Sequence, residues 1–215
     1  MGCITKHYLN ESTALGVWKI EEDIDTLLGM VVLDNEEKNK YKSFTSTSRK
    51  LEFLSVRALL SELIGRDARI VYNKFNKPFL KDGSRFISIS HSHKLTAILS
   101  SVNEKVGIDL EYMSANIGAF AFKFMNRKEK ITKNTHDRKY HLYIHWCAKE
   151  SLYKICDKEG ISIRNDITIE PFEVKESGEI KGKVRNEKLN ESFDLFYSRY
   201  DNYAIVWTKK AYENK

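Results

Sequence analysis

The chain of 215 residues is long enough for one domain or two small fused domains, each able to bury a hydrophobic core. Hydrophobic residues make up 41% and charged residues 31%, with only two prolines, which excludes a disordered or collagen-like protein. The formal net charge of +6 favours anionic partners, and a nucleic acid, a phosphorylated cofactor and an acidic protein all remain open.

Export signals and membrane spans are not expected from this sequence. It lacks the apolar run of a signal peptide and any stretch near the roughly 18 apolar residues that span a membrane. Its three cysteines, Cys3, Cys147 and Cys156, share no metal-ligand spacing. We therefore expect a reduced protein of the cytoplasm that does not bind membranes.

The first half of the chain predicts helices followed by strands. Asp34 and Glu37 have capping-box spacing, which predicts a short helix after them. A second helix is predicted from Ser46–Ser48 to Gly65, because apolar residues recur at helical spacing and the glycine suits a C-terminal cap. Short β-like runs are predicted at 70–72, 86–90, 95–102 and 106–110.

The second half repeats the order of helices and then strands. After Glu111, a helical, aromatic and then basic stretch is predicted to continue to about Lys133, followed by a loop at 136–138. The longest predicted helix runs from Tyr140 to Lys158 and ends at Gly160. The β-like runs after it lie at 161–169, 172–174, 193–200 and 203–208. This order is compatible with two α+β halves that meet near residue 105.

The first group of residues that could carry out chemistry is the hexapeptide Val-Gly-Ile-Asp-Leu-Glu at 106–111. On a strand, its apolar residues would face the core, while Asp109 and Glu111 would project together from the other face. Two carboxylates on one face suit Mg²⁺, whose coordination is usually completed by water and substrate phosphates. An ordinary amphipathic strand with its polar face in water would show the same pattern, so the hexapeptide alone does not decide.

The second constellation lies on the longest predicted helix. Glu150 and Lys154 are four residues apart and share a face with Trp146, so they could bind a metal and a phosphate side by side. The same spacing is typical of surface ion pairs that contribute little. Because Trp146 and Tyr153 indicate that this helix is mostly buried, the surface alternative is weakened.

The third constellation combines the run Ile-Ser-Ile-Ser-His-Ser-His at 87–93 with the loop before it. Hydroxyls and a histidine at a strand end are good donors to phosphate, and Lys77 before Pro78 is held on an extended, rigid segment. His91 and His93 could instead bind zinc, although the spacing is weak evidence without further cysteine or histidine partners. As a third alternative, either histidine could have only a structural role, with its ring nitrogens hydrogen-bonded within a turn.

Together, the order and spacing of these motifs resemble the 4′-phosphopantetheinyl transferases, of the larger type that serves surfactin and other nonribosomal synthetases. That family is marked by a Lys-Pro loop, an Ile-Ser-His element, a Val-Gly-Ile-Asp-x-Glu strand and a Trp-x-x-Lys-Glu-x-x-x-Lys helix. The matching residues here are Lys77-Pro78, Ile89-Ser90-His91, 106–111 and 146–154. The resemblance runs from about Glu36 to Trp207 and departs from the pattern at Asn76, where a glycine often stands.

The resemblance implies a cytoplasmic, monomeric enzyme with an α+β fold. Its two similar α/β subdomains, 1–105 and 106–215, would be related by a pseudo-two-fold axis, each a small, mainly antiparallel sheet packed with helices. Coenzyme A would bind in the cleft between them. The enzyme would transfer the 4′-phosphopantetheine arm of coenzyme A to a serine of an apo acyl or peptidyl carrier protein and release adenosine 3′,5′-bisphosphate.

The resemblance also assigns roles to individual residues. Asp109, Glu111 and Glu150 would hold Mg²⁺, or Mn²⁺ in its place. The expected catalytic residues are Glu150 as the candidate general base, Lys154 and His91, which fits the need to neutralise charge on a pyrophosphate under attack. The residues expected to contact coenzyme A are Lys40, Arg57, Lys74, Lys77, Pro78, Ser90, His91, Asp109 and Lys154.

The segment after the metal strand is where the family meets its carrier protein. Its apolar residues are Phe120, Phe122, Phe124 and Met125, and its basic residues are Lys123, Arg127, Lys128 and Lys130. The aromatic residues could equally fill the core of the second half. The basic residues would steer an acidic carrier toward the site.

Two other classes of protein fit parts of the pattern. A metal-dependent nuclease or phosphohydrolase would also use carboxylates on a strand and a basic surface, but no known nucleic-acid-binding motif is present, and we expect no nucleic-acid partner. A noncatalytic module that binds an acidic partner could retain the motifs for structure alone.

Overall fold

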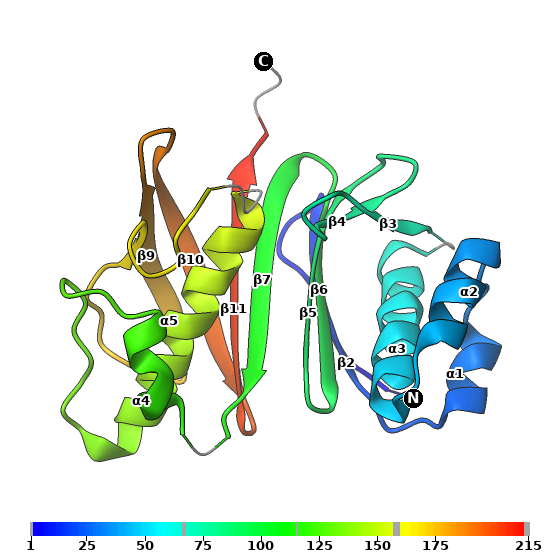
Figure 1. Cartoon of the computed structure of the whole chain (residues 1–215), viewed down its shortest axis with the longest axis horizontal. Coiled ribbons are helices and arrows are strands. Elements are labelled where there is room, and N and C mark those ends of the chain that lie inside the picture. The colour runs from blue at the N-terminus through cyan, green and yellow to red at the C-terminus, as the bar shows by residue number, and fades with distance from the viewer. Residues whose placement is uncertain (1, 66–67, 115, 157–159, 213–215) are drawn as a thin grey trace.

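The computed structural model describes residues 2–65, 68–114, 116–156 and 160–212. The chain forms two antiparallel sheets, each packed with helices, so the α+β fold class predicted from the sequence is confirmed. Strands β5 and β7 lie side by side in the middle of the molecule, with α3 and α5 on opposite sides of them (Figure 1). Each helix in the described part of the chain is too short or too polar to cross a membrane.

The first half holds a four-stranded sheet, a helical layer and a small hairpin. Its elements are β1 (Cys3–Tyr8), β2 (Thr13–Lys19), α1 (Ile24–Met30), α2 (Asn35–Ser43), α3 (Thr47–Ile64), β3 (Ile70–Tyr72), β4 (Pro78–Leu80), β5 (Phe86–Ser92) and β6 (Leu95–Ser101). The sheet has the strand order β1-β2-β6-β5, and β3 pairs with β4 in a separate hairpin.

The second half holds a five-stranded sheet crossed by the longest helix. Its elements are β7 (Glu104–Tyr112), α4 (Ile117–Phe120), the 3₁₀ turn η1 (Ala121–Lys123), α5 (Thr135–Ile155), β8 (Ile167–Ile169), β9 (Ser177–Arg185), β10 (Asn190–Tyr200) and β11 (Tyr203–Ala211). The strand order is β7-β11-β10-β9-β8.

The two halves share one connectivity. In each half a strand leads to a long helix and then to a hairpin whose second strand pairs with the first strand, as in β2–α3–β5–β6 and β7–α5–β10–β11. The turn between the sheets lies at residues 102–103. This matches the expectation of similar halves, while the assignment of 1–105 and 106–215 as separate domains stays a prediction.

A glycine in the first of these strands lets each long helix approach its sheet. A Cβ atom added at Gly16 of β2 would lie 2.8 Å from Leu59 Cδ1 of α3. A Cβ atom added at Gly107 of β7 would overlap the carbonyl oxygen of Ser151 in α5. Because only glycine leaves this space, the Val-Gly-Ile part of the motif fixes the distance between β7 and α5.

The strand β7 faces two different environments, as its alternating sequence predicts. Val106, Ile108 and Leu110 are buried in an apolar cluster with residues of β2 and β6, which joins the two sheets. Asp109 and Glu111 therefore project from the opposite face, the one that α5 covers.

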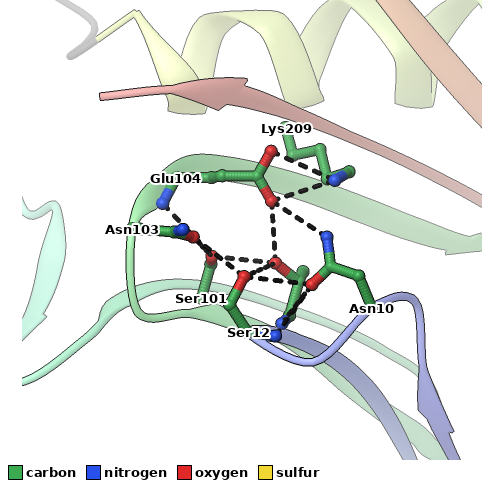
Figure 2. A network of polar contacts seen from close by, with 7 residues as sticks. Asn10, Ser12, Ser101, Asn103, Glu104 and Lys209 are labelled. Carbon is green, nitrogen blue, oxygen red and sulfur yellow. Dashed lines mark hydrogen bonds and ion pairs between the residues drawn. The ribbon is translucent and has the colours of Figure 1, made fainter. Parts of the chain in front are cut away.

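A polar network closes the seam at one end (Figure 2). Glu104 at the start of β7 accepts hydrogen bonds from Lys209 of β11 at 2.9 Å and from Thr13 of β2 at 2.9 Å. Asn10 and Asn103 extend the network into the turns before β2 and β7. The network therefore ties the turns of the first half to two strands of the second.

Local signals in the sequence predicted several boundaries correctly. Asp34 and Glu37 form the reciprocal capping box at the start of α2. Gly65 ends α3 with a left-handed backbone, φ 68°, which glycine adopts without strain.

Other predictions were wrong. Residues 136–138 belong to α5 rather than to a loop, because the side chain of Asn134 caps the helix by accepting from the amide of His136. The helical stretch expected to reach Lys133 is limited to α4 and η1. Residues 161–166 and 172–174 lie outside the strands, and the predicted end of the long helix at Lys158 falls outside the described residues.

Candidate active site

A cationic cavity of about 300 Å³ lies between α3, the β3–β4 hairpin and β5. Basic groups dominate its ionisable lining, with Glu52 as the single acid. Six of the residues predicted to contact coenzyme A or to act in catalysis line it: Lys40, Arg57, Lys77, Pro78, His91 and Lys154. Such a concentration of positive charge suits a ligand with several phosphates.

The β3–β4 turn holds Lys77 at the cavity wall. The side-chain oxygen of Asn73 accepts from the amides of Phe75 and Lys77 at 2.9 and 3.0 Å. Asn76 has φ 57°, the left-handed conformation that asparagine tolerates better than most residues. The departure from the family's glycine at Asn76 therefore preserves the turn.

Arg49 is a cavity residue that the sequence did not indicate. Its Nη1 lies 2.7 Å from Glu52 Oε2 and 3.4 Å from Nε2 of His91. Partial burial of the ring lowers the pKa of His91, Glu52 opposes this, and Arg49 adds to it. The spacing of Arg49 and Glu52, three residues apart on α3, is that of an ordinary surface ion pair, so only the fold shows that they frame His91.

Arg57 forms part of the buried wall of the cavity. Its Nε donates to Glu37 Oε1 at 2.8 Å, and its guanidinium lies 3.3 Å from the ring centre of Phe53. Burial lowers the pKa of Arg57, and Glu37 opposes this effect. Arg57 is thus fixed in place beside the cavity.

The two other predicted lysines of this region differ in position. Lys40 lies over the ring of Tyr72, with 5.1 Å from Nζ to the ring centre, and lines the cavity. Lys74 lies over the ring of Phe75, at 4.8 Å, and does not belong to the cavity lining.

Lys154 reaches the seam from α5. Its Nζ donates to Asp109 Oδ1 at 2.7 Å, to the carbonyl oxygen of Ile108 at 2.9 Å and to that of Ile89 at 3.3 Å. Because Ile89 lies on β5 and the other two on β7, the ammonium group bridges the halves at the edge of the cavity.

Ser90 differs from the expected phosphate donor. Its hydroxyl donates to Asp109 Oδ1 at 2.8 Å, and it does not line the cavity. The structure therefore places Ser90 behind a carboxylate and leaves His91, the next residue, at the cavity.

Glu111 sits two residues beyond Asp109 on the same face of β7. Ser92 donates to its Oε2 at 2.7 Å, and Trp146 Nε1 lies 3.5 Å from its Oε1. Burial raises the pKa of Glu111, the bond from Ser92 opposes this, and the charge of Asp109 raises it further. A cation bound nearby would stabilise the negative charge of two neighbouring carboxylates in this setting.

The donor set fits a divalent cation. Asp109 Oδ2 is buried and has no hydrogen-bond partner, while Oδ1 is held by Ser90 and Lys154. Glu150 lies between Trp146 and Lys154 on one face of α5, and those two neighbours contact Glu111 and Asp109. Among the described residues, no group of three histidine, cysteine, aspartate or glutamate side chains is arranged so that it could hold a metal ion, so ligation by Glu150 stays a prediction.

A second cavity of about 510 Å³ has Glu111, but not Asp109, in its lining. Phe120 lines it and is exposed, Phe122 is also exposed, and Phe124 is buried against Trp146. The aromatic residues after β7 therefore divide between surface and core. His93 lines this second cavity and stacks on Tyr112, whereas His91 lines the first, so the two histidines do not share one zinc site.

Comparison with known proteins bears on the second half of the chain. Residues 105–208 match the model of the 4′-phosphopantetheinyl transferase superfamily. The matched segment begins in β7 and ends in β11, and it includes Asp109, Glu111, Glu150 and Lys154. No curated protein matches the sequence at a significant level.

Proposed function

We propose that the protein is a 4′-phosphopantetheinyl transferase of the larger type that serves nonribosomal synthetases, acting as a monomer in the cytoplasm. One observation carries the proposal. The segment that matches the superfamily brings Lys154, paired with Asp109, to a cationic cavity that the unmatched first half builds, and it holds Glu111 two residues further along the same strand. A ligand rich in phosphate, such as coenzyme A, can use both parts at once.

The first half would bind the phosphates of coenzyme A. Lys40, Arg49 and Lys77 place positive charge around the cavity, and Arg57 adds a buried guanidinium in its wall. Arginine and lysine donors of this kind form charge-assisted hydrogen bonds to phosphate oxygens. His91 lies where the cavity approaches Lys154 and would contact the pyrophosphate.

The second half would carry the chemistry. Asp109, through its free oxygen, with Glu111 and Glu150, would hold Mg²⁺ or Mn²⁺, which when bound stabilises negative charge on the pyrophosphate oxygens. Lys154 orients Asp109 through the bond to Oδ1 and adds its own charge at the cavity edge.

The proposed reaction is a phosphoryl-type transfer to an incoming hydroxyl. The serine oxygen of the apo carrier forms a bond to the phosphorus that carries the pantetheine arm, and the bond from that phosphorus to the bridging oxygen breaks. The serine proton passes to Glu150, and adenosine 3′,5′-bisphosphate leaves with the electron pair of the broken bond.

The test is an intact-mass measurement on apo carrier proteins. The full chain is incubated with coenzyme A, Mg²⁺ and a panel of acyl and peptidyl carriers, and the expected result is a mass gain of one phosphopantetheine on at least one carrier. Parallel incubations with DNA and RNA test for a nuclease. Cleavage there, or binding of an acidic carrier with no mass gain in any member of the panel, would contradict the proposal.

A further inference from the structure

Among the described residues, the two sheets meet along β5 and β7 without a backbone ladder between them. In that part of the chain, β5 pairs only with β6, and β7 pairs only with β11. Three serines at alternate positions of β5 fill the gap. The amides of Ile108, Leu110 and Tyr112 in β7 donate to the hydroxyl oxygens of Ser88, Ser90 and Ser92 at 3.0, 3.2 and 3.1 Å.

These contacts satisfy backbone groups that would otherwise be buried without partners. Residue numbers rise together on both sides of the seam, so β5 and β7 run parallel. A buried amide without an acceptor is costly, and each serine supplies one acceptor. The serines thus act first as structural links between the halves.

Two of the three serines also donate their hydroxyl proton to a carboxylate. Ser90 donates to Asp109 Oδ1 at 2.8 Å and Ser92 donates to Glu111 Oε2 at 2.7 Å. Each therefore holds a carboxylate and the amide of the residue that follows it. Ser88 faces the same pattern with Gly107 in place of a carboxylate, and among the described residues its hydroxyl contacts the amide of Ile108 but no carboxylate.

These bonds decide which oxygen atoms remain for a cation. Asp109 Oδ1 is occupied by Ser90 and Lys154, which leaves the buried Oδ2 bare. Ser92 likewise takes Oε2 of Glu111, whose Oε1 has only the long contact of 3.5 Å with Trp146 Nε1. Partners that hydrogen-bond to metal ligands orient them and commonly change metal affinity by 10- to 100-fold.

We propose that Ser90 and Ser92 are positioning residues that hold Asp109 and Glu111 in the orientation needed to bind a divalent cation. The ligands come from the second half and the hydroxyls that orient them come from the first, so the cation site is complete only when the halves are docked. This inference rests on the metal-dependent function proposed above and extends it to residues outside the segment that matches the superfamily.

The test compares S90A and S92A with S88A as the matched control. Mn²⁺ binding to each full-length variant is measured by electron paramagnetic resonance, with and without coenzyme A, and thermal unfolding is followed in parallel. The dissociation constant for Mn²⁺ is expected to rise about 10-fold or more in S90A and S92A. S88A loses an amide acceptor and melts at a lower temperature, but keeps the wild-type affinity for Mn²⁺ in the measurement without coenzyme A, which is the one to compare because Ser88 lines the first cavity. S92T restores the hydroxyl and is expected to restore binding.

Three results would overturn the positioning role. These are unchanged Mn²⁺ affinity in S90A and S92A, an equal loss of affinity in S88A, and a wild-type protein that binds no Mn²⁺ under either condition. Failure of the proposed function would look different. Wild-type protein that binds Mn²⁺ in the predicted serine-dependent way, yet modifies no carrier, would leave the positioning role standing and remove the transferase activity.

Discussion

Helix α5 carries two lysines that each pair with a carboxylate, and the two pairs differ in nearly every physical respect. Lys149 Nζ lies 2.8 Å from Glu129 Oε2, and both side chains are fully buried. Lys154 Nζ lies 2.7 Å from Asp109 Oδ1, and the lysine is 18% exposed at the edge of a cavity. One pair lies inside the second half, and the other lies at the seam.

The Glu129–Lys149 pair is saturated. Lys149 also donates to the carbonyl oxygens of Phe124 and Ile167, at 2.7 and 2.8 Å. The two oxygens of Glu129 accept from the amides of Ile169 and Asn126, at 2.8 and 2.9 Å. With every partner supplied by the protein, this pair fastens the segment after η1 and strand β8 to α5.

The Asp109–Lys154 pair is saturated on one side only, because Asp109 Oδ2 has no partner. An ion pair with a free buried oxygen beside a cationic cavity can act on a ligand, whereas a saturated pair can only hold the fold. The two pairs therefore differ in whether a carboxylate oxygen is left without a partner, and not in their residue types, which are the same in kind at both places.

The largest effect is expected from E150Q, which removes the candidate general base next to the Asp109–Lys154 pair. The rate of phosphopantetheine transfer should fall by about 10²- to 10⁴-fold, while coenzyme A still binds in isothermal titration calorimetry. The matched control E187Q changes an exposed glutamate of the β9–β10 turn and should transfer at the wild-type rate. Unchanged turnover in E150Q would remove Glu150 from the mechanism.

Replacing each lysine with methionine in turn tests the two pairs directly. K149M leaves the carboxylate of Glu129 buried without its cation and should lower the free energy of unfolding by about 3–5 kcal/mol. K154M should cost less stability, because its site is partly open to solvent, and should lose transfer activity instead. Urea unfolding of both variants decides, and equal losses of stability would erase the distinction between the pairs.

Acid should destabilise the second half of the molecule through His141 of α5. Burial of this side chain, which is 3% exposed, lowers its pKa to about 4 from 6.5; neighbouring His145 adds to the shift and Asp137 opposes it. The unfolded chain therefore takes up a proton near pH 6.5 while the folded one resists until about pH 4. Stability should be complete above pH 6.5 and fall by up to about 3 kcal/mol between these values.

The variant H141Q isolates this contribution. It should flatten the loss of unfolding free energy between pH 6.5 and 4, whereas H136Q, at an exposed histidine of the same helix, should keep the wild-type slope. Parallel slopes in H141Q and the wild type would show that acid acts elsewhere.

The smallest effect concerns long-range charge near the second cavity. Lys123, Arg127, Lys128 and Lys130 are all exposed after β7. If they steer an acidic carrier, kcat/KM should fall several-fold as ionic strength rises, and K123E should weaken that dependence. K188E, at an exposed lysine of the β9–β10 turn, is the control. A salt-independent kcat/KM would contradict steering.

Sequence patterns within a single helix or strand were enough to predict the parts of the site that lie on one such element. Alternation along β7 placed Asp109 and Glu111 on one face, and the four-residue spacing placed Glu150 with Lys154 on α5. The capping box at Asp34 and the glycine cap at Gly65 were predicted for the same reason.

Features that depend on contacts between elements could not be predicted in this way. Ser90 lies next to His91 in a run of possible phosphate donors, and only the docking of β5 on β7 shows that its proton goes to Asp109. Lys149 and Glu150 are adjacent in the motif, yet the buried partner Glu129 gives Lys149 a structural role. Strand β9 carries two glycines and four charged residues among its nine, so its sequence alone does not indicate a strand.

The most direct test of the two roles is the intact mass of an apo carrier protein after incubation with coenzyme A, Mg²⁺ and wild-type, D109N or E129Q protein, at a temperature where all three are folded. The account predicts a mass gain of one phosphopantetheine with the wild type and with E129Q, and none with folded D109N over the same time. Transfer by D109N at the wild-type rate, or no mass gain with the wild type, would contradict it.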